Sequence, residues 1–331
     1  MLLYCCWLLL VAAGCCCLRD AHNNRDLVEN EWKLSASWKA HSGSVWKVCW
    51  AHPEFGQIVA SCSFDRSVVV WEEEEPGKVW QKRATLVDSR DSVFDISFSP
   101  RHLGLKLATC SGDGFVRIYE AIDVINLAHW PLMEEFEAEK RGANSISWCS
   151  SPFERPMLAV GSNETVAKVW EYNDKLRRWQ VVARLDTHTG AVHDVAWAPS
   201  LGRSFHLIAT ASYDTFVRIF KLAKDASNAE PSGADTPGNA AAAAADDGTA
   251  VPAVAAAAVA VASSSAGTTD ASGWTVRELA AFDDHKAEVW RVEWNVTGST
   301  LASSGDDGAV RLFKANLLGQ WGALSVISGE Q

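Results

Sequence analysis

The sequence predicts an all-β fold, a β-propeller with five complete repeats, and two observations carry this prediction. Short stretches in which apolar and polar residues alternate recur at intervals close to fifty residues. The chain also contains 16 tryptophans, several times the usual share, which indicates that Trp is used repeatedly at equivalent places. Alternation with period two indicates short, half-buried strands, and strands repeated at this interval are typical of the four-stranded blades of a propeller.

Each repeat predicts its strands in the same order. In the first complete copy, residues 45–50 alternate as a first strand, and residues 59–64 follow as a second strand of small side chains. A tight turn at Asp65 then leads into a β-branched third strand that ends on Trp71. The corresponding segments of the later copies are residues 93–119, 146–170, 188–220 and 285–313.

An acidic residue of the turn always stands six positions before the aromatic residue that closes the third strand. These acidic residues are Asp65, Asp113, Glu164, Asp214 and Asp307, which are separated by 48, 51, 50 and 93 residues. The last interval is long because the fourth copy carries an insertion.

The insertion covers residues 226–273 and is rich in Ala. It contains Gly and Pro252 and lacks large apolar residues, so it has no core of its own. We expect a disordered loop within a propeller domain of residues 31–331, with a partner-binding segment as the alternative. Residues 274–282 then resume the blade as its outer strand.

The recurrence of His, a small residue, Asp and Trp at fixed places resembles the WD40 repeat. That resemblance implies a buried network in which the Asp of the turn accepts a hydrogen bond from the His of the preceding loop. A Ser or Thr and the Trp N–H extend the network, and paired polar groups of this kind would fix the geometry of a blade. The residues expected to form it are His41, Asp65, Trp71, Asp113, Glu164, His188, Asp214, His285 and Asp307. Ser89 and Glu139 stand at the His position of the second and third copies, where we expect different or incomplete networks.

We expect no catalytic, metal or cofactor site. The His–Asp pairs resemble catalytic dyads, but an active site is needed once, whereas these pairs recur from blade to blade. The remaining histidines are isolated in the sequence, and no C-x-x-C or H-E-x-x-H spacing provides a metal-binding pattern. The sequence therefore predicts a non-enzymatic protein without cofactors.

The net charge limits the classes of partner that we expect, and the cysteine content indicates the redox state of the compartment. A net charge of −11 without a basic run gives no attraction to phosphate backbones, so we expect no direct binding to nucleic acid. Five of the nine cysteines lie in the first 17 residues, and the other four lie in strand-like apolar runs. Free Cys behaves there as a small apolar residue, which favours a reducing compartment.

Residues 1–30 form an atypical apolar, Cys-rich segment outside the repeat pattern. The first 18 residues carry no charge, a length at the lower limit for a membrane span and typical of the apolar part of a signal peptide. A signal peptide would require a Lys or Arg before the apolar run, and this sequence has none there. Three interpretations stay open: an incorrectly assigned first exon, a genuine signal or anchor, and an unusual strand region. Glycosylation sequons at Asn163 and Asn295 would matter only in the secretory pathway.

Several loop phrases are more specific than the repeat pattern. They resemble segments of the small WD-repeat nucleoporins of the Y-shaped outer-ring complex, the SEH1-like family. The runs concerned are residues 38–46, 50–56, 60–65, 86–90, 201–206 and 289–292. The resemblance covers residues 32–320 apart from the Ala-rich insertion. It implies a non-enzymatic scaffold of the nuclear pore at the nuclear envelope, which serves mRNA export and protein transport.

The resemblance also implies partners. Members of the family form an open six-bladed propeller whose gap is filled by a blade from an α-solenoid nucleoporin, beside other nucleoporins of the Y-complex. They also belong to the GATOR complex, which relays amino-acid status to TORC1 signalling. Membership of that complex implies a second location, at the lysosomal or vacuolar membrane surface. This sequence departs from the family because residues 1–30 stand in the place of the first repeat. We expect residues 32–38 to be the outer strand of a first blade that is otherwise missing or replaced.

Two other functions stay open. The related propeller shared by the COPII vesicle coat and the nuclear pore would have similar blades and a similar open edge. Residues 1–18 alone would indicate a secreted or membrane-anchored WD-repeat binding module, and membrane contact is expected only if this segment is an anchor. The residues that contact partners cannot be identified from spacing.

Overall fold

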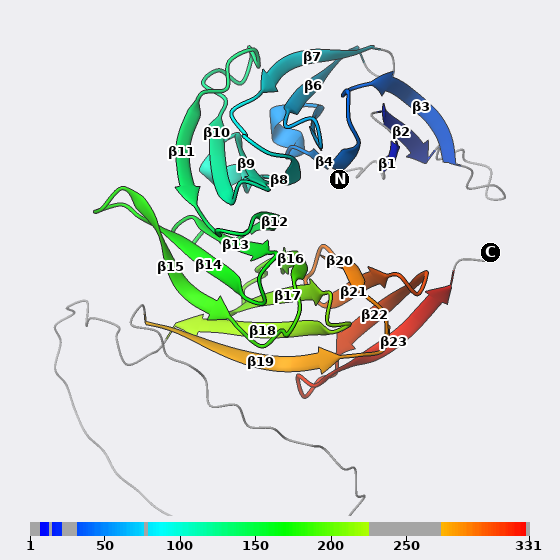
Figure 1. Cartoon of the computed structure of the whole chain (residues 1–331), viewed down its shortest axis with the longest axis vertical. Coiled ribbons are helices and arrows are strands. Elements are labelled where there is room, and N and C mark those ends of the chain that lie inside the picture. The colour runs from blue at the N-terminus through cyan, green and yellow to red at the C-terminus, as the bar shows by residue number, and fades with distance from the viewer. Residues whose placement is uncertain (1–6, 13–14, 22–31, 76–78, 225–272, 329–331) are drawn as a thin grey trace, which may run out of the picture.

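The chain forms six antiparallel β-sheets that follow one another around a ring in the computed structural model (Figure 1). The structure describes residues 7–12, 15–21, 32–75, 79–224 and 273–328. The ring is open between its first and last sheets, as Figure 1 shows. The predicted all-β open propeller is therefore confirmed.

Five of the sheets contain four strands each, and in each sheet the chain runs from the inside of the ring outward. Their strands are β4 (Val45–Trp50), β5 (Ile58–Ser63), β6 (Val68–Glu75) and β7 (Val79–Leu86); β8 (Val93–Phe98), β9 (Lys106–Ser111), β10 (Phe115–Glu120) and β11 (Leu132–Glu137); β12 (Ala143–Trp148), β13 (Met157–Ser162), β14 (Ala167–Asn173) and β15 (Arg178–Leu185); β16 (Val192–Trp197), β17 (His206–Ser212), β18 (Val217–Lys224) and β19 (Trp274–Phe282); and β20 (Val289–Trp294), β21 (Thr300–Gly305), β22 (Ala309–Ala315) and β23 (Trp321–Ser328). Two short 3-10 helices, Pro53–Phe55 and Arg101–Leu103, follow β4 and β8.

The first sheet has three strands, β1 (Trp7–Ala12), β2 (Cys15–Ala21) and β3 (Trp32–Lys39), in that order. β3 contains the outer strand predicted at residues 32–38. β1 and β2 come from the apolar segment of residues 1–30, so this segment supplies two strands in the place of a first repeat. Within the described part of the chain, no helix is both long and apolar enough to cross a membrane.

The fourth blade continues across the Ala-rich insertion. β18 and β19 pair antiparallel, with Lys224 opposite Trp274. The chain therefore leaves and re-enters the blade at the same end of this strand pair. The outer strand predicted at residues 274–282 is present. The loop predicted at residues 226–273 lies outside the described residues except for Gly273.

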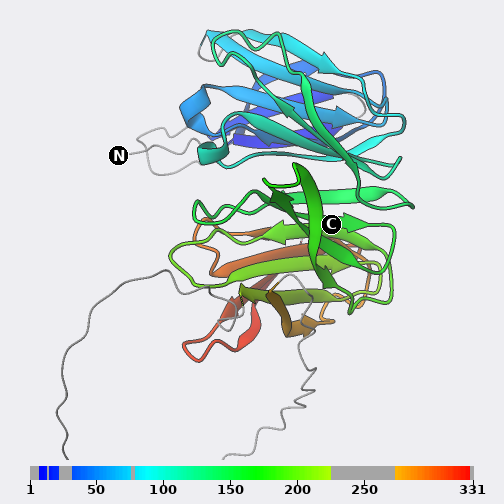
Figure 2. The same ribbon diagram turned by 90° about the vertical axis from the view of Figure 1, so that its left-hand side faces the viewer.

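The core lies between neighbouring sheets. One buried cluster packs Ile58 and Val70 of the β4–β7 sheet against Ile96 and Leu107 of the β8–β11 sheet. Three more clusters join the later sheets pairwise, and the last of them joins β16–β19 to β20–β23. Each four-stranded sheet is thus held chiefly by its neighbours. Figure 2 shows the ribbon from the side.

The three-stranded sheet is attached to this series through aromatic contacts. Trp38 of β3 lies 5.3 Å from Trp71 and 5.4 Å from Trp80 between ring centroids, and the second pair is stacked. Aromatic pairs at such distances stabilise by about 0.5–1.5 kcal/mol beyond the area they bury. Part of the prominent Trp content therefore serves contacts between sheets.

The turns between second and third strands have a common backbone conformation. The residue after the acidic position has a positive φ in four blades: Arg66 (69°), Gly114 (83°), Thr215 (71°) and Gly308 (68°). This conformation costs a residue with a side chain about 1–2 kcal/mol, whereas Gly adopts it freely. Gly is therefore favourable at these positions, and two of the four use it.

Gly114 and Gly308 occupy equivalent turn positions but have different surroundings. A Cβ atom at Gly114 would lie 1.8 Å from the carbonyl oxygen of Glu139, whereas a Cβ at Gly308 would meet nothing within 4 Å. We expect Gly308→Ala to lower the free energy of unfolding by about 1–2 kcal/mol from backbone strain alone, and Gly114→Ala to lower it by about 3 kcal/mol or more. Urea denaturation of the two variants measures both losses. Equal losses of unfolding free energy would contradict the close packing described at Gly114.

Candidate functional site

The predicted network of the first complete blade lies between the loop after β3 and the strands β5 and β6. His41 is 5% exposed; its Nδ1 lies 3.2 Å from a carboxylate oxygen of Asp65, and its Nε2 lies 2.8 Å from the hydroxyl of Ser61. Trp71 Nε1 donates to the same hydroxyl at 3.2 Å. Burial lowers the pKa of His41, so the ring is neutral at pH 7. A neutral ring donates from Nδ1 to Asp65 and accepts at Nε2, which makes the series of bonds consistent from end to end.

Two later blades repeat the arrangement, with Nδ1 of a buried His facing the turn Asp and Nε2 facing a hydroxyl of the second strand. The residues are His188, Asp214 and Thr210 in the β16–β19 sheet, and His285, Asp307 and Ser303 in the β20–β23 sheet. The shortest Nδ1–carboxylate distances are 3.0 and 2.8 Å. The third strands of these blades close on Phe220 and Phe313, which have no N–H to extend the network as Trp71 does.

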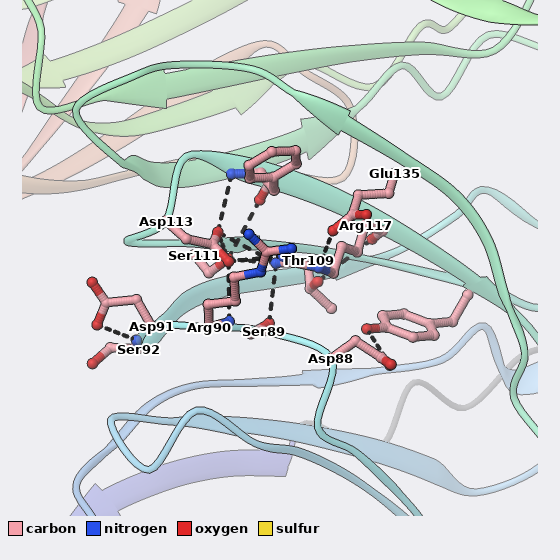
Figure 3. Close-up of polar contacts among 12 residues, drawn as sticks. Asp88, Ser89, Arg90, Asp91, Ser92, Thr109, Ser111, Asp113, Arg117 and Glu135 are labelled. Carbon is pink, nitrogen blue, oxygen red and sulfur yellow. Dashed lines mark hydrogen bonds and ion pairs between the residues drawn. The ribbon is translucent and has the colours of Figure 1, made fainter.

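In the β8–β11 blade, a buried Arg takes the place of the His (Figure 3). Arg117 Nη2 donates to Asp113 at 2.8 Å, and its Nη1 donates to Ser111 at 2.9 Å. Its Nε forms an ion pair with Glu135 at 2.8 Å, and Ser89 lies at the edge of the group, 3.4 Å from Nη1. The Arg117 side chain is 1% exposed. A guanidinium thus reaches the turn Asp from the third strand of the same blade.

The β12–β15 blade uses a different ion pair. Lys168 Nζ lies 2.7 Å from a carboxylate oxygen of Glu139, which stands at the His position and is 4% exposed. Glu164, the acidic turn residue, donates its backbone N–H to Ser162 Oγ. Burial raises the pKa of Glu139, Glu164 raises it further, and Lys168 lowers it. The charge pair in this blade therefore joins the loop to the third strand without a bond to the turn acid.

Sequence reasoning missed Arg117 and Lys168. Both stand four residues after the acidic turn residue, within an apolar third strand, and both copies lack the loop His. A charged residue at a buried strand position requires a partner, so this combination was the available signal.

Two buried aspartates near the centre of the ring tie neighbouring inner strands together. Asp95 of β8 accepts the backbone N–H of Ile146 in β12 at 2.9 Å, and Lys47 of β4 lies 2.7 Å from its carboxylate. Asp194 of β16 accepts the N–H of Val292 in β20 at 3.0 Å. Burial raises the pKa of Asp194, while Lys47 acts in the opposite direction. Each aspartate therefore links consecutive blades across their inner strands.

Cys49, Cys62, Cys110 and Cys149 are free thiols. Burial raises the pKa of Cys49 to about 12 and holds those of Cys62 and Cys110 well above their usual range, so these groups are protonated and unreactive at pH 7. No group of three or more potential metal ligands occurs within the described ranges.

The last blade exposes an apolar sheet face at the open side of the ring. Val310 of β22 is 38% exposed and Leu312 is half-buried. The equivalent residues of the other complete blades are at most 2% exposed: Val68 and Val70, Val116 and Ile118, Ala167 and Val169, and Val217 and Ile219. In those blades the next sheet covers this face.

Repeated four-stranded sheets with a loop His bonded to a turn Asp define the class of WD-repeat propellers. The model of the WD domain, G-beta repeat, matches residues 32–72, 80–120, 179–221 and 276–314. The chain is 46% identical over 315 residues to Nucleoporin SEH1 of Bos taurus, which covers 90% of this chain and 77% of that protein. The Homo sapiens protein of that name is 45% identical with the same coverage, and that of Xenopus tropicalis is 45% identical over 322 residues, 92% of this chain and 79% of that protein. The chain therefore belongs to the nucleoporin SEH1 family, which confirms the resemblance found in the sequence.

Replacement of Arg117 tests the ion pair in the β8–β11 blade. Arg117→Met leaves Asp113 in a buried site without its cation, and removal of one partner from a buried pair costs about 3–5 kcal/mol. Arg101→Met is the control, because Arg101 is 68% exposed and lies 3.8 Å from Glu54; we expect a loss under about 0.5 kcal/mol. Urea denaturation measures both, and a loss in Arg117→Met no larger than in the control would show that the pair contributes little.

Acid titration of stability tests the same turn. Burial alone would raise the pKa of Asp113, but hydrogen bonds from Arg117 and Ser111 outweigh it and lower the pKa to about 2. A carboxylate with a depressed pKa stabilises the fold above its unfolded pKa near 4, and this contribution is lost as the pH falls through about 2. The free-energy difference between wild type and Asp113→Asn should therefore shrink by about 2 kcal/mol between pH 5 and pH 2. A difference independent of pH would contradict the assignment.

Proposed function

We propose that this protein is a non-enzymatic scaffold subunit of the nuclear-pore outer-ring complex, serving mRNA export and protein transport. Membership of the nucleoporin SEH1 family supports a scaffold role at the nuclear pore. The repetition of the His–Asp pairs supports the absence of catalysis, because each pair holds its own loop and turn together. The blade networks of the nine predicted residues, supplemented by Arg117 and Lys168, would then be structural devices.

The observation that carries the proposal is the uncovered face of the last blade. Val310 and Leu312 lie where every other complete blade is covered by its successor, and the ring is open at that side. We infer that an α-solenoid nucleoporin supplies a blade in trans, which covers this face and extends the ring. Exposed strand edges and apolar sheet faces are satisfied in the same way whenever a partner adds strands.

The same open side is available to a second assembly. The family resemblance extends the proposal to the GATOR complex in amino-acid signalling to TORC1, at the lysosomal or vacuolar surface. One open side binds one blade at a time, so the two assemblies would contain separate copies of this protein.

Affinity purification of the protein from its own cells, followed by mass spectrometry, tests the proposal. Wild type should recover α-solenoid nucleoporins of the outer ring, and GATOR subunits if the second assembly exists. Recovery of vesicle-coat subunits would favour the coat propeller, and secretory proteins with glycans at Asn163 or Asn295 would favour a secreted module. Either result without nucleoporins overturns the scaffold assignment.

A charge on the open face tests where the partner binds. Val310→Glu would bury an unpaired carboxylate under the donated blade, so recovery of the solenoid partner should fall at least about tenfold. Val296→Glu, at a loop residue that is 75% exposed, is the matched control and should recover the partner normally. Thermal melting checks that both variants remain folded. Equal recovery by the two variants would place the partner elsewhere while leaving the scaffold assignment intact.

A further inference from the structure

The inner strands carry a repeated irregularity at one end of the ring. Each complete blade has a β-bulge between the first and third residues of its inner strand, so the second residue is left out of the ladder with the next strand. These residues are Trp46, Phe94, Asn144, His193 and Trp290. A bulge re-aims the side chain of its extra residue, and bulges are frequent next to functional sites. We call the end of the ring where the inner strands begin, and where the acidic turns lie, the turn face.

Four of the five bulge residues carry rings, and the rings associate in pairs. Trp46 contacts Phe94 edge-on at 5.7 Å, and His193 stacks on Trp290 at 4.3 Å between centroids. Trp46 and Trp290 are each 46% exposed, and the neighbouring Tyr213 is 57% exposed and 6.3 Å from His193. Large aromatic residues left exposed in two groups on one face mark a binding surface more often than isolated exposed residues do.

Carboxylates accompany the aromatic groups. Trp290 Nε1 donates to Asp306 at 2.5 Å, and Glu288 lies 3.9 Å from His193 Nε2. Burial lowers the pKa of His193, so its ring is neutral at pH 7 and does not repel a cation. The loops of the turn face contain 13 Asp or Glu and five Lys or Arg. Three of these acids pair with cations of the third strands, and the remaining ten against five still make this end of the ring acidic.

The cations that directly follow the two tryptophans in sequence are paired with aspartates. Lys47 and Arg291 follow Trp46 and Trp290 directly in their strands. Lys47 lies 2.7 Å from Asp95, and Arg291 lies 3.7 Å from Asp194. The exposed aromatic rings therefore combine with a surplus of negative charge.

We propose that the turn face binds an extended protein segment through its Lys or Arg side chains, which lie against Trp46 and Trp290. A cation over an aromatic ring is attracted by the negative face of the ring, and nearby carboxylates strengthen the attraction. Such a pair of sites accepts basic side chains and disfavours acidic ones.

Synthetic peptides on the full-length protein test the proposal. Four dodecapeptides with one Gly-Ser-Ala background carry three Arg, three Lys, three Gln or three Glu, and binding is followed by fluorescence anisotropy of a label on the peptide. The Arg and Lys peptides should bind at least about tenfold more tightly than the Gln peptide, and the Glu peptide should bind least. Equal binding of all four peptides, or preference for the Glu peptide, overturns the proposal.

Two variants separate the aromatic site from general attraction to an acidic surface. The double substitution Trp46→Ala and Trp290→Ala retains every carboxylate but should weaken binding of the Arg peptide at least about tenfold. Phe153→Ala, at a residue 90% exposed in the loop between β12 and β13 at the other end of the ring, should bind like wild type. Asp306→Asn with Glu288→Gln should weaken binding most at low salt. Unchanged binding by the tryptophan variant, when thermal melting shows it folded, would overturn the proposal.

Discussion

Each sheet of the ring has two apolar faces, and each face must be covered by a neighbour. This constraint explains why the core consists of clusters between sheets, in which Ile58 and Val70 meet Ile96 and Leu107. It also explains the buried polar groups, because the loops that join one blade to the next pass through the crowded region between them. Asp95 and Asp194 satisfy backbone N–H groups of the following blade and so add directional bonds to the apolar contacts.

More than one kind of polar pair satisfies the buried polar groups of the loops. A neutral His between a carboxylate and a hydroxyl, as at His41, needs no compensation of charge. The guanidinium of Arg117 and the ammonium of Lys168 neutralise acids instead, at a larger desolvation cost. The blades keep one geometry despite this chemical variation because the requirement is a satisfied network, whatever residues form it.

The sequence predicted the fold because repeats report it five times over, and one copy with unusual residues does not obscure the others. It also predicted two outer strands outside the regular spacing: residues 32–38, which precede the first complete repeat, and residues 274–282, which follow the Ala-rich insertion. For the second and third blades the sequence signalled a buried charge at Arg117 and Lys168 but not its partners, since one-dimensional spacing does not contain those contacts. Exposure of Trp46 and Trp290 was equally hidden, because it depends on bulges that shift the register of an otherwise regular strand.

The ring is an arc with two ends, and this has a consequence for cooperativity. An inner blade is held from two sides, whereas the β20–β23 sheet packs on one described neighbour only. In such nearest-neighbour arrays the terminal units have the lowest local stability and open first. A partner that bridges both ends would convert the arc into a closed circle without terminal units. Its binding would therefore suppress fraying throughout the propeller, and part of the folding free energy of this chain would reside in the assembly.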